Sequence, residues 1–274
     1  MSGSGNDFVF FDARNTGAGP DELENPADIA AICAPHLGVG ADGVVFIVDS
    51  ADALFAIRYY NADGSRASLC GNASLCAAQS AVRLGLATQE QMFHFMSDAG
   101  LIAAELDLSG EATIRLAPVT ALESDAAEVR GPGERRIGYA VVGVPHLVVM
   151  VDDVSSVDVT ERGRILRNGA ARAPEGANVN FVSGDGDTGP WRIRTYERGV
   201  EGETYACGTG AVASAACLIA WNRPLGNTPN APVRLLTASG RTLSVKLPDD
   251  AKAEYSVLSG EGRVVYDGVL RSLR

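Results

Sequence analysis

Two cysteines, each followed by glycine, are the residues of this 274-residue chain best suited to chemistry. Cys70-Gly71-Asn72 and Cys207-Gly208-Thr209 each follow a polar, glycine-containing loop and precede a run of small apolar residues with helical spacing. The first amides of a helix have no partner within the helix and carry partial positive charge. A thiol at such a position has a lowered pKa, and the amides can bind an anion such as a carboxylate.

A pair of such thiols can invert the configuration of an α-carbon without a cofactor. One thiolate removes the α-proton, and the carbanion is stabilised as an enediolate because the charge developing on the carboxylate meets preorganised amides. The opposite thiol delivers a proton to the other face, and the two thiols exchange roles in the reverse direction. Since the sequence shows neither a pyridoxal-type lysine pattern nor a cluster of metal ligands, we expect no cofactor and no metal.

The two cysteines belong to an internal repeat. Five pairs of similar short segments recur in one order at offsets of 136 to 140 residues, and Cys70 and Cys207 form one of these pairs. The other pairs are residues 5–9 with 143–147, 40–42 with 176–178, 58–61 with 194–197, and 99–100 with 239–240. Such regular self-similarity indicates two copies of one fold unit. Each copy would present one Cys-Gly pair at the same place.

The elements that must position the cysteines can be read in both copies. Strand patterns cover 8–12, 44–48 and 54–60 in the first copy and 147–151, 179–182 and 191–196 in the second. Helices are predicted over 71–84, ending at Gly85, and over 208–222, ending before Pro224. A hairpin over 101–118 with its tip at Ser109-Gly110 and strands over 241–247 and 254–270 complete the pattern.

Both predicted helices are apolar nearly all round, which is typical of buried helices. Their matching stripes are Leu75, Ala78 and Val82 in the first, and Val212, Ala215 and Ile219 in the second. Small side chains would let a sheet wrap closely around each helix. We expect a domain boundary near Ala117-Pro118, giving domains of residues 1–117 and 118–262, with the last strand, 263–274, pairing back into the first.

Composition limits the class of protein. Hydrophobic residues make up 46% of the chain, and the net charge of −11 disfavours nucleic acid as a partner. No apolar run approaches the roughly 20 residues that cross a bilayer, and no signal peptide is visible, so we expect no membrane association. Five cysteines at irregular spacing favour reduced thiols in the cytoplasm, with Cys33, Cys76 and Cys217 as buried apolar residues. His36 and His94 are expected to be surface or packing residues.

With these residues in view, the chain resembles the diaminopimelate epimerase family of pyridoxal-independent amino-acid epimerases. The matching motifs span nearly the whole chain in the family's order. They are Gly5-Asn6-Asp7-Phe8, Gly38-Val39-Gly40-Ala41-Asp42-Gly43, Asn61-Ala62-Asp63-Gly64-Ser65, Cys70-Gly71-Asn72, Pro145-His146, Ala177-Asn178, Glu197-Arg198-Gly199 and Gly202-Glu203-Thr204-Tyr205-Ala206-Cys207-Gly208-Thr209-Gly210. The resemblance implies an α+β fold of two pseudo-symmetric domains. Each is a mixed, mostly antiparallel sheet curled barrel-like around a central helix, with the active site between them.

The resemblance also implies roles for individual residues. Cys70 and Cys207 would be the acid/base pair, with Cys70 as the donor and Cys207 as the acceptor, and His146 and Glu197 would lie beside them and tune their protonation. Substrate contacts would come from Asn6, Asn61, Gly71, Asn72, Asn178, Glu197, Arg198, Gly208 and Thr209. The implied reaction converts LL-2,6-diaminopimelate to the meso form, for lysine and peptidoglycan precursors. A homodimer and a small-molecule amino-acid substrate are the implied partners.

Several positions depart from the family's pattern and leave alternatives open. Many members have asparagine before Pro-His, where this chain has Val144, and Ala73, Ser74 and Leu75 differ from the usual Gly-Ala-Arg after Cys-Gly-Asn. Substrate identity is affected more than reaction type, so a racemase of another amino acid using the same thiols is the first alternative. A binding or redox-sensing module in which Cys70 and Cys207 form a disulfide is the second.

Overall fold

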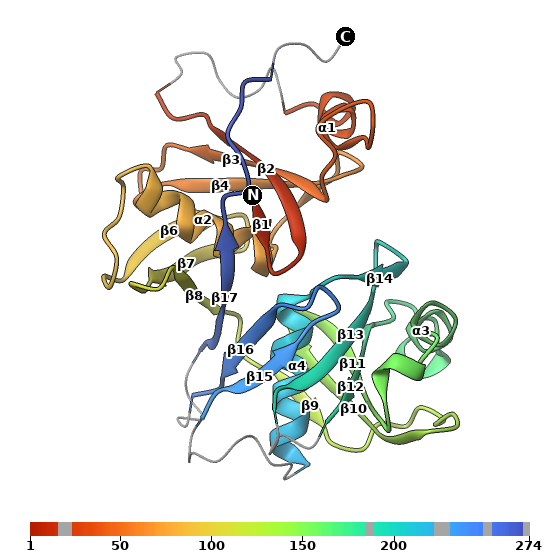
Figure 1. The fold of residues 1–274 in the computed structure, drawn as a ribbon. Coiled ribbons are helices and arrows are strands. Elements are labelled where there is room, and N and C mark those ends of the chain that lie inside the picture. The colour runs from red at the N-terminus through yellow and green to blue at the C-terminus, as the bar shows by residue number, and fades with distance from the viewer. Residues whose placement is uncertain (16–23, 185–188, 222–230, 249–253, 271–274) are drawn as a thin grey trace. The chain divides into compact units, whose positions relative to one another are not determined.

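The computed structural model describes residues 1–15, 24–184, 189–221, 231–248 and 254–270 (Figure 1). The chain divides into two compact units. Unit 1 comprises Met1–Ile114 and Gly260–Arg274, and unit 2 comprises Arg115–Ser259. The fold is of the α+β class, and in each unit a mixed, mostly antiparallel sheet curls around a central helix.

Unit 1 is built on strands with two helices inserted between them. Its strands are β1 (Ser2–Gly3), β2 (Asn6–Asp12), β3 (Gly43–Val48), β4 (Ala56–Asn61), β5 (Arg66–Ala67), β6 (Phe93–Ser97) and β7 (Gly100–Leu106), followed by β8 (Glu111–Leu116) at the unit boundary. Helix α1 (Pro26–Cys33) connects β2 to β3, and the central helix α2 (Gly71–Arg83) follows β5. The predicted hairpin over 101–118 is confirmed as β7 and β8, and Gly110 at its tip has a φ of 86°.

Unit 2 repeats this order of elements. Its strands are β9 (Ala121–Glu123), β10 (Glu134–Val142), β11 (Val144–Val151), β12 (Asn178–Ser183), β13 (Trp191–Glu197), β14 (Gly202–Thr204), β15 (Val233–Leu236), β16 (Thr242–Lys246) and β17 (Ser256–Arg263), the last of which runs on into unit 1. Short helices η2 (Val154–Ser156) and η3 (Ala170–Arg172) flank α3 (Val159–Arg167), and α4 (Gly208–Ala220) is the central helix.

Strand pairing confirms the internal repeat predicted from sequence. In both units two neighbouring strands pair in parallel, β2 with β3 and β11 with β12. The next pair is antiparallel, β3 with β4 and β12 with β13, and a second parallel pair follows, β4 with β6 and β13 with β15. Each central helix has 13 residues, ten of which are buried. The two copies therefore share topology as well as sequence signals.

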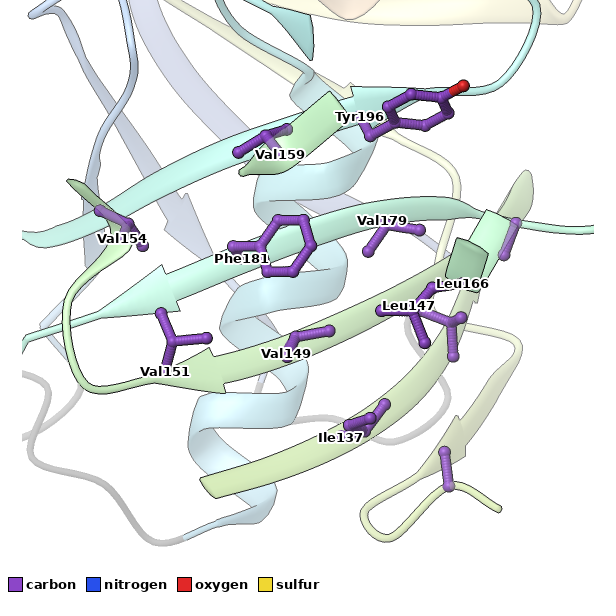
Figure 2. Close-up of a cluster of buried hydrophobic side chains, with 12 residues drawn as sticks. Ile137, Leu147, Val149, Val151, Val154, Val159, Leu166, Val179, Phe181 and Tyr196 are labelled. Carbon is purple, nitrogen blue, oxygen red and sulfur yellow. The ribbon is translucent and has the colours of Figure 1, made fainter. Parts of the chain in front are cut away.

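Strands β11 and β12 are buried on both faces, and alternation assigns each side chain to one of them. Odd-numbered residues such as Val149 and Phe181 join a hydrophobic cluster with Val159 and Leu166 of α3 (Figure 2). Even-numbered residues of the two strands point to the opposite face, which packs against α4. Polar side chains at even positions of β11 and β12 are therefore directed toward the central helix.

The structure corrects some sequence expectations. Only residues 256–263 of the predicted 254–270 strand are extended; residues 264–270 form no regular element, and most of this segment is exposed. Ile219, predicted to lie on the buried stripe, is 41% exposed, and Leu218 is buried in its place. The predicted stop at Pro224 lies outside the described residues. Among the described helices, none is long and apolar enough to cross a membrane.

Two helices were missed by the sequence interpretation. Helix α1 carries the usual start signals: Asn25 caps it by accepting a hydrogen bond of 2.9 Å from the Asp28 amide, and Pro26 follows at its first position. Helix α3 begins the same way, because Asp158 accepts a hydrogen bond of 2.9 Å from the Glu161 amide. These capping residues were the signals in the sequence from which both helices could have been predicted.

Candidate active site

Each predicted catalytic cysteine is the N-cap of its unit's central helix, as the sequence predicted. Cys70 precedes α2 with φ −133° and ψ 118°, and Cys207 precedes α4 with φ −134° and ψ 114°. Both cysteines are half-buried, whereas the other three are buried, and none of the five is in a disulfide. The two thiols therefore occupy nearly identical backbone positions, each at the electropositive end of a buried helix.

The Cys207 sulfur has two polar neighbours in its own helical turn. The amide of Gly210 donates to Sγ at 3.4 Å, and Thr209 Oγ1 lies 3.6 Å from Sγ. Hydrogen bonds to the charged form of a group favour that form. This turn is therefore suited to a thiolate.

In unit 1 a chain of hydrogen bonds orients the predicted substrate ligands near α2. Asn72 Nδ2 donates to Asn6 Oδ1 at 2.6 Å, and Asn6 Nδ2 donates to Asp42 Oδ2 at 3.0 Å. Because a carboxylate only accepts, Asp42 fixes which end of the Asn6 amide faces Asn72. Asn61 is held separately, since its Nδ2 donates to Ser65 Oγ at 3.0 Å.

In unit 2 the predicted ligands lie at the ends of β12 and β13. The Arg198 amide donates to Asn178 Oδ1 at 2.7 Å, and Thr204 Oγ1 donates to Glu197 Oε2 at 2.9 Å. The Arg198 guanidinium donates to the Glu175 carbonyl at 3.3 Å. These contacts fix the carboxylate of Glu197 at the end of β13 and the guanidinium of Arg198 directly after it. A guanidinium is suited to binding a carboxylate.

His146 is fully buried on β11, where it pairs in register with Asn178. Burial lowers its pKa to about 3, with a smaller contribution from the positive charge of Arg198. The ring is therefore neutral at physiological pH. Its Nε2 atom is buried and has no hydrogen-bond partner among the described residues.

The predicted site residues fall into two sets, one in each unit. Unit 1 holds Asn6, Asn61, Cys70, Gly71 and Asn72, and unit 2 holds His146, Asn178, Glu197, Arg198, Cys207, Gly208 and Thr209. Sequence reasoning did not single out Asp42 or Asn180, which contact these residues directly. Asp42 lay within a quoted motif, and an asparagine inside the apolar run of β12 was the available signal for Asn180. No cluster of three metal-binding side chains occurs among the described residues.

Comparison with solved structures identifies the fold. A phenazine biosynthesis protein of the PhzF family from Bacillus anthracis superposes with a TM-score of 0.70 at 15% identity, covering 95% of this chain and 92% of that one. A hydroxyproline epimerase from Agrobacterium vitis gives a TM-score of 0.58 at 18% identity, covering 87% and 78%. At such low identity the likeness concerns the fold.

Comparison of sequences identifies the family. The diaminopimelate epimerase family profile matches residues 1–121 and 138–265. The diaminopimelate epimerase of Gemmatimonas aurantiaca is 44% identical, covering 100% of this chain and 98% of that protein. That of Aquifex aeolicus is 37% identical, covering 98% and 96%. This chain therefore belongs to the diaminopimelate epimerase family and is an isomerase of the amino-acid epimerase type.

Proposed function

We propose that this enzyme converts LL-2,6-diaminopimelate to meso-diaminopimelate by a two-thiol acid–base reaction that needs no cofactor. The observation that carries the proposal is the pair of half-buried cysteines, each the N-cap of a buried central helix with nearly the same backbone angles. The relatives named diaminopimelate epimerase support the choice of substrate. The product would serve the synthesis of lysine and peptidoglycan precursors.

In the proposed reaction the thiolate of Cys207 takes the α-proton of the LL substrate. The electron pair of the C–H bond passes into the carboxylate as an enediolate, which the amides of Gly208 and Thr209 and those of Gly71 and Asn72 stabilise. The thiol of Cys70 then protonates the opposite face and becomes a thiolate. In the reverse direction the two sulfurs exchange roles.

The neighbours of the two thiols would bind the substrate and adjust protonation. The Arg198 guanidinium would pair with a carboxylate, while the amide oxygens of Asn6, Asn61 and Asn178 would accept hydrogen bonds from ammonium groups. Glu197 would tune the protonation of the thiols and assist in binding the substrate. His146, which is neutral because it is buried, would stabilise the Cys207 thiolate without competing with the sulfur for the proton. A substrate with two amino-acid ends suits this combination of groups.

The alternative substrate is a different amino acid processed by the same two thiols. Val144, the half-buried first residue of β11, favours this alternative because the family's pattern has asparagine there, a residue that could contact the distal end of diaminopimelate. Incubation of the enzyme in deuterium oxide with a panel of L-amino acids that includes LL-diaminopimelate would show which of them is the substrate. We expect α-deuterium in the diaminopimelate and in no other member of the panel.

The same experiment tests the two-thiol reaction. Cys70→Ala and Cys207→Ala should each abolish deuterium incorporation and epimerisation, because each removes one of the two proton carriers. Cys217→Ala is the matched control: this cysteine is buried near the C-terminal end of α4, far along the helix from Cys207, and should be dispensable for exchange. Epimerisation at near wild-type rate by either of the first two variants would refute the scheme.

We further propose a homodimer that acts in the cytoplasm on a small molecule and binds neither nucleic acid nor membrane. The family resemblance supports the dimer, and the negative charge of −11 argues against a phosphate backbone as partner. An odd number of cysteines at irregular spacing favours reduced thiols and a reducing compartment. Sedimentation equilibrium of the purified enzyme at several concentrations would measure the subunit number directly.

A further inference from the structure

A buried amide in unit 2, Asn180 of β12, contacts His146 from a neighbouring strand. Asn180 is fully buried, and its Nδ2 donates to the Leu147 carbonyl at 3.0 Å and lies 3.2 Å from His146 Nδ1. Its Oδ1 accepts a hydrogen bond of 3.0 Å from Thr195 Oγ1. One side chain of β12 thus joins three groups on its two neighbouring strands, β11 and β13.

These contacts determine the orientation of the amide and the tautomer of the ring. The Leu147 carbonyl can only accept, so the amide nitrogen must be on that side, and its remaining proton points to His146 Nδ1. Nδ1 is therefore the acceptor. A neutral imidazole with an unprotonated Nδ1 carries its proton on Nε2, the atom that has no partner among the described residues.

The same amide lies against the helical turn that carries Cys207. A β-carbon added to Gly210 would be 2.2 Å from Asn180 Oδ1 and 3.3 Å from Cys207 Cβ. Only a glycine at position 210 leaves room for the amide, because a real β-carbon essentially never approaches another atom to less than 3.0 Å. Asn180 thus connects the ring of His146 to the first turn of α4.

The repeat supplies an internal comparison. Register pairing makes Phe8, Val45 and Tyr59 of unit 1 equivalent to His146, Asn180 and Thr195 of unit 2. Ala73, three residues after Cys70, is the equivalent of Gly210. Phe8 and Tyr59 form an edge-to-face aromatic pair with centroids 6.0 Å apart. The fold therefore accommodates less polar residues at these positions, so it does not itself require the amide network of unit 2.

We propose that Asn180 is a positioning residue for the reaction, holding His146 as the neutral tautomer with its proton on Nε2, beside the turn that carries Cys207. The inference rests on the role proposed above for His146. A ring in this form can donate a hydrogen bond from Nε2 but cannot accept a proton there. It can stabilise a thiolate while leaving proton transfer to sulfur.

Nitrogen NMR of the imidazole rings tests the tautomer without turnover. The chain has three histidines, so long-range proton–nitrogen spectra of the whole protein are simple to assign with a His146→Gln variant. We expect unprotonated Nδ1 and protonated Nε2 for wild-type His146. In Asn180→Asp the new carboxylate oxygen can only accept, so Nδ1 should become protonated. Protonated Nδ1 in the wild type, or unprotonated Nδ1 in the folded Asn180→Asp variant, would overturn the proposal.

Thr195→Val is the matched control for Asn180→Asp. It removes the hydrogen bond to Oδ1 but leaves the Nδ2 contacts, so the wild-type tautomer should persist. Asn180→Asp should lower kcat about tenfold relative to this control with little change in KM, the effect expected for loss of one hydrogen bond to a positioned group. An equal kcat in the two variants would refute a role in the reaction.

A second variant covers the case in which the buried aspartate prevents folding. Asn180→Val introduces the residue that unit 1 holds at the equivalent position, so it should fold while removing the donor to His146. Its kcat should also fall about tenfold, and an unchanged kcat would contradict the proposal. Failure of the proposed function can be distinguished from failure of the Asn180 proposal. It would appear as absence of α-deuterium exchange in the wild-type enzyme.

Discussion

His146 shows how the surroundings of one residue determine its chemistry. An exposed imidazole has a pKa near 6.5 and is charged in mildly acidic solution. Here full burial, and to a smaller extent the charge of Arg198, lowers the pKa to about 3. The ring in the native enzyme is therefore a neutral hydrogen-bonding group at any pH well above 3.

This shift predicts a pH dependence of stability. Between pH 6.5 and about 3 the unfolded chain binds a proton at His146 that the native protein does not, so the native state loses stability as pH falls through this window. The loss should approach about 1.4 kcal/mol per pH unit. Relative to His146→Gln, the wild-type free energy of unfolding in urea should decline between pH 6.5 and 5. A constant difference between the two proteins would contradict the buried neutral ring.

The central helices depend on small residues where strands cross them. A β-carbon added to Gly138 of β10 would be 2.8 Å from Cys217 Sγ and 2.9 Å from the Trp221 ring, both at the C-terminal end of α4. In unit 1 an added β-carbon on Gly3 would be 2.5 Å from the Asn72 carbonyl of α2. In both copies a glycine of a strand therefore allows close approach to the central helix, at the C-terminal end of α4 and at the N-terminal end of α2.

We expect Gly138→Ala to destabilise the protein by about 1–3 kcal/mol, because overpacking a filled core forces side chains and backbone to shift. Urea denaturation monitored by circular dichroism would measure the loss. Gly202→Ala in the same unit is the control: an added β-carbon there meets no atom of the described residues within 4 Å, so the change should be within about 0.5 kcal/mol. Equal stability of the two variants would argue against tight packing of β10 on α4.

Across the whole molecule the five thiols fall into two classes. Cys70 and Cys207 are half-buried at helix N-termini, whereas Cys33, Cys76 and Cys217 are buried in packed regions. Burial raises the pKa of Cys33 to about 11, with the nearby carboxylates of Asp7 and Asp42 adding to the shift, and burial alone raises that of Cys217 to about 12. Burial also raises the pKa of Cys76. Buried thiols with raised pKa values react slowly.

Alkylation of the native enzyme should therefore be selective. Brief treatment with iodoacetamide near neutral pH should label Cys70 and Cys207, and mass spectrometry of the digested protein should find the other three cysteines unmodified. Activity should fall in parallel with labelling of this pair. Comparable labelling of Cys33 or Cys217 under native conditions would show that the two classes do not exist. The enzyme should also need a reductant for full activity, because the two accessible thiols, Cys70 and Cys207, are the ones open to oxidation.

Local signals in the sequence were sufficient to predict the internal repeat and both central helices. They also predicted that Cys70 and Cys207 lie at the starts of these helices. Cysteine-glycine pairs and runs of small apolar residues act over a few neighbouring residues, and the repeat is visible because such short motifs recur in the same order. The end of α2 was also determined locally, since Gly85 adopts the left-handed backbone that terminates helices, with φ 70°.

Other features depended on which strands came to lie side by side. Asn180 meets His146 only because β11 and β12 pair in parallel with one register, and a shift of one residue would turn the amide to the face packed against α3. The segment 264–270, apolar enough to be expected as a strand, has no regular pairing because extended chain becomes a strand only where a neighbour supplies hydrogen bonds. The sequence alone therefore determined the features that depend on neighbouring residues, such as a cysteine at the start of each central helix. The partners of buried polar groups were decided by the tertiary structure, because register and burial are properties of the assembled sheet.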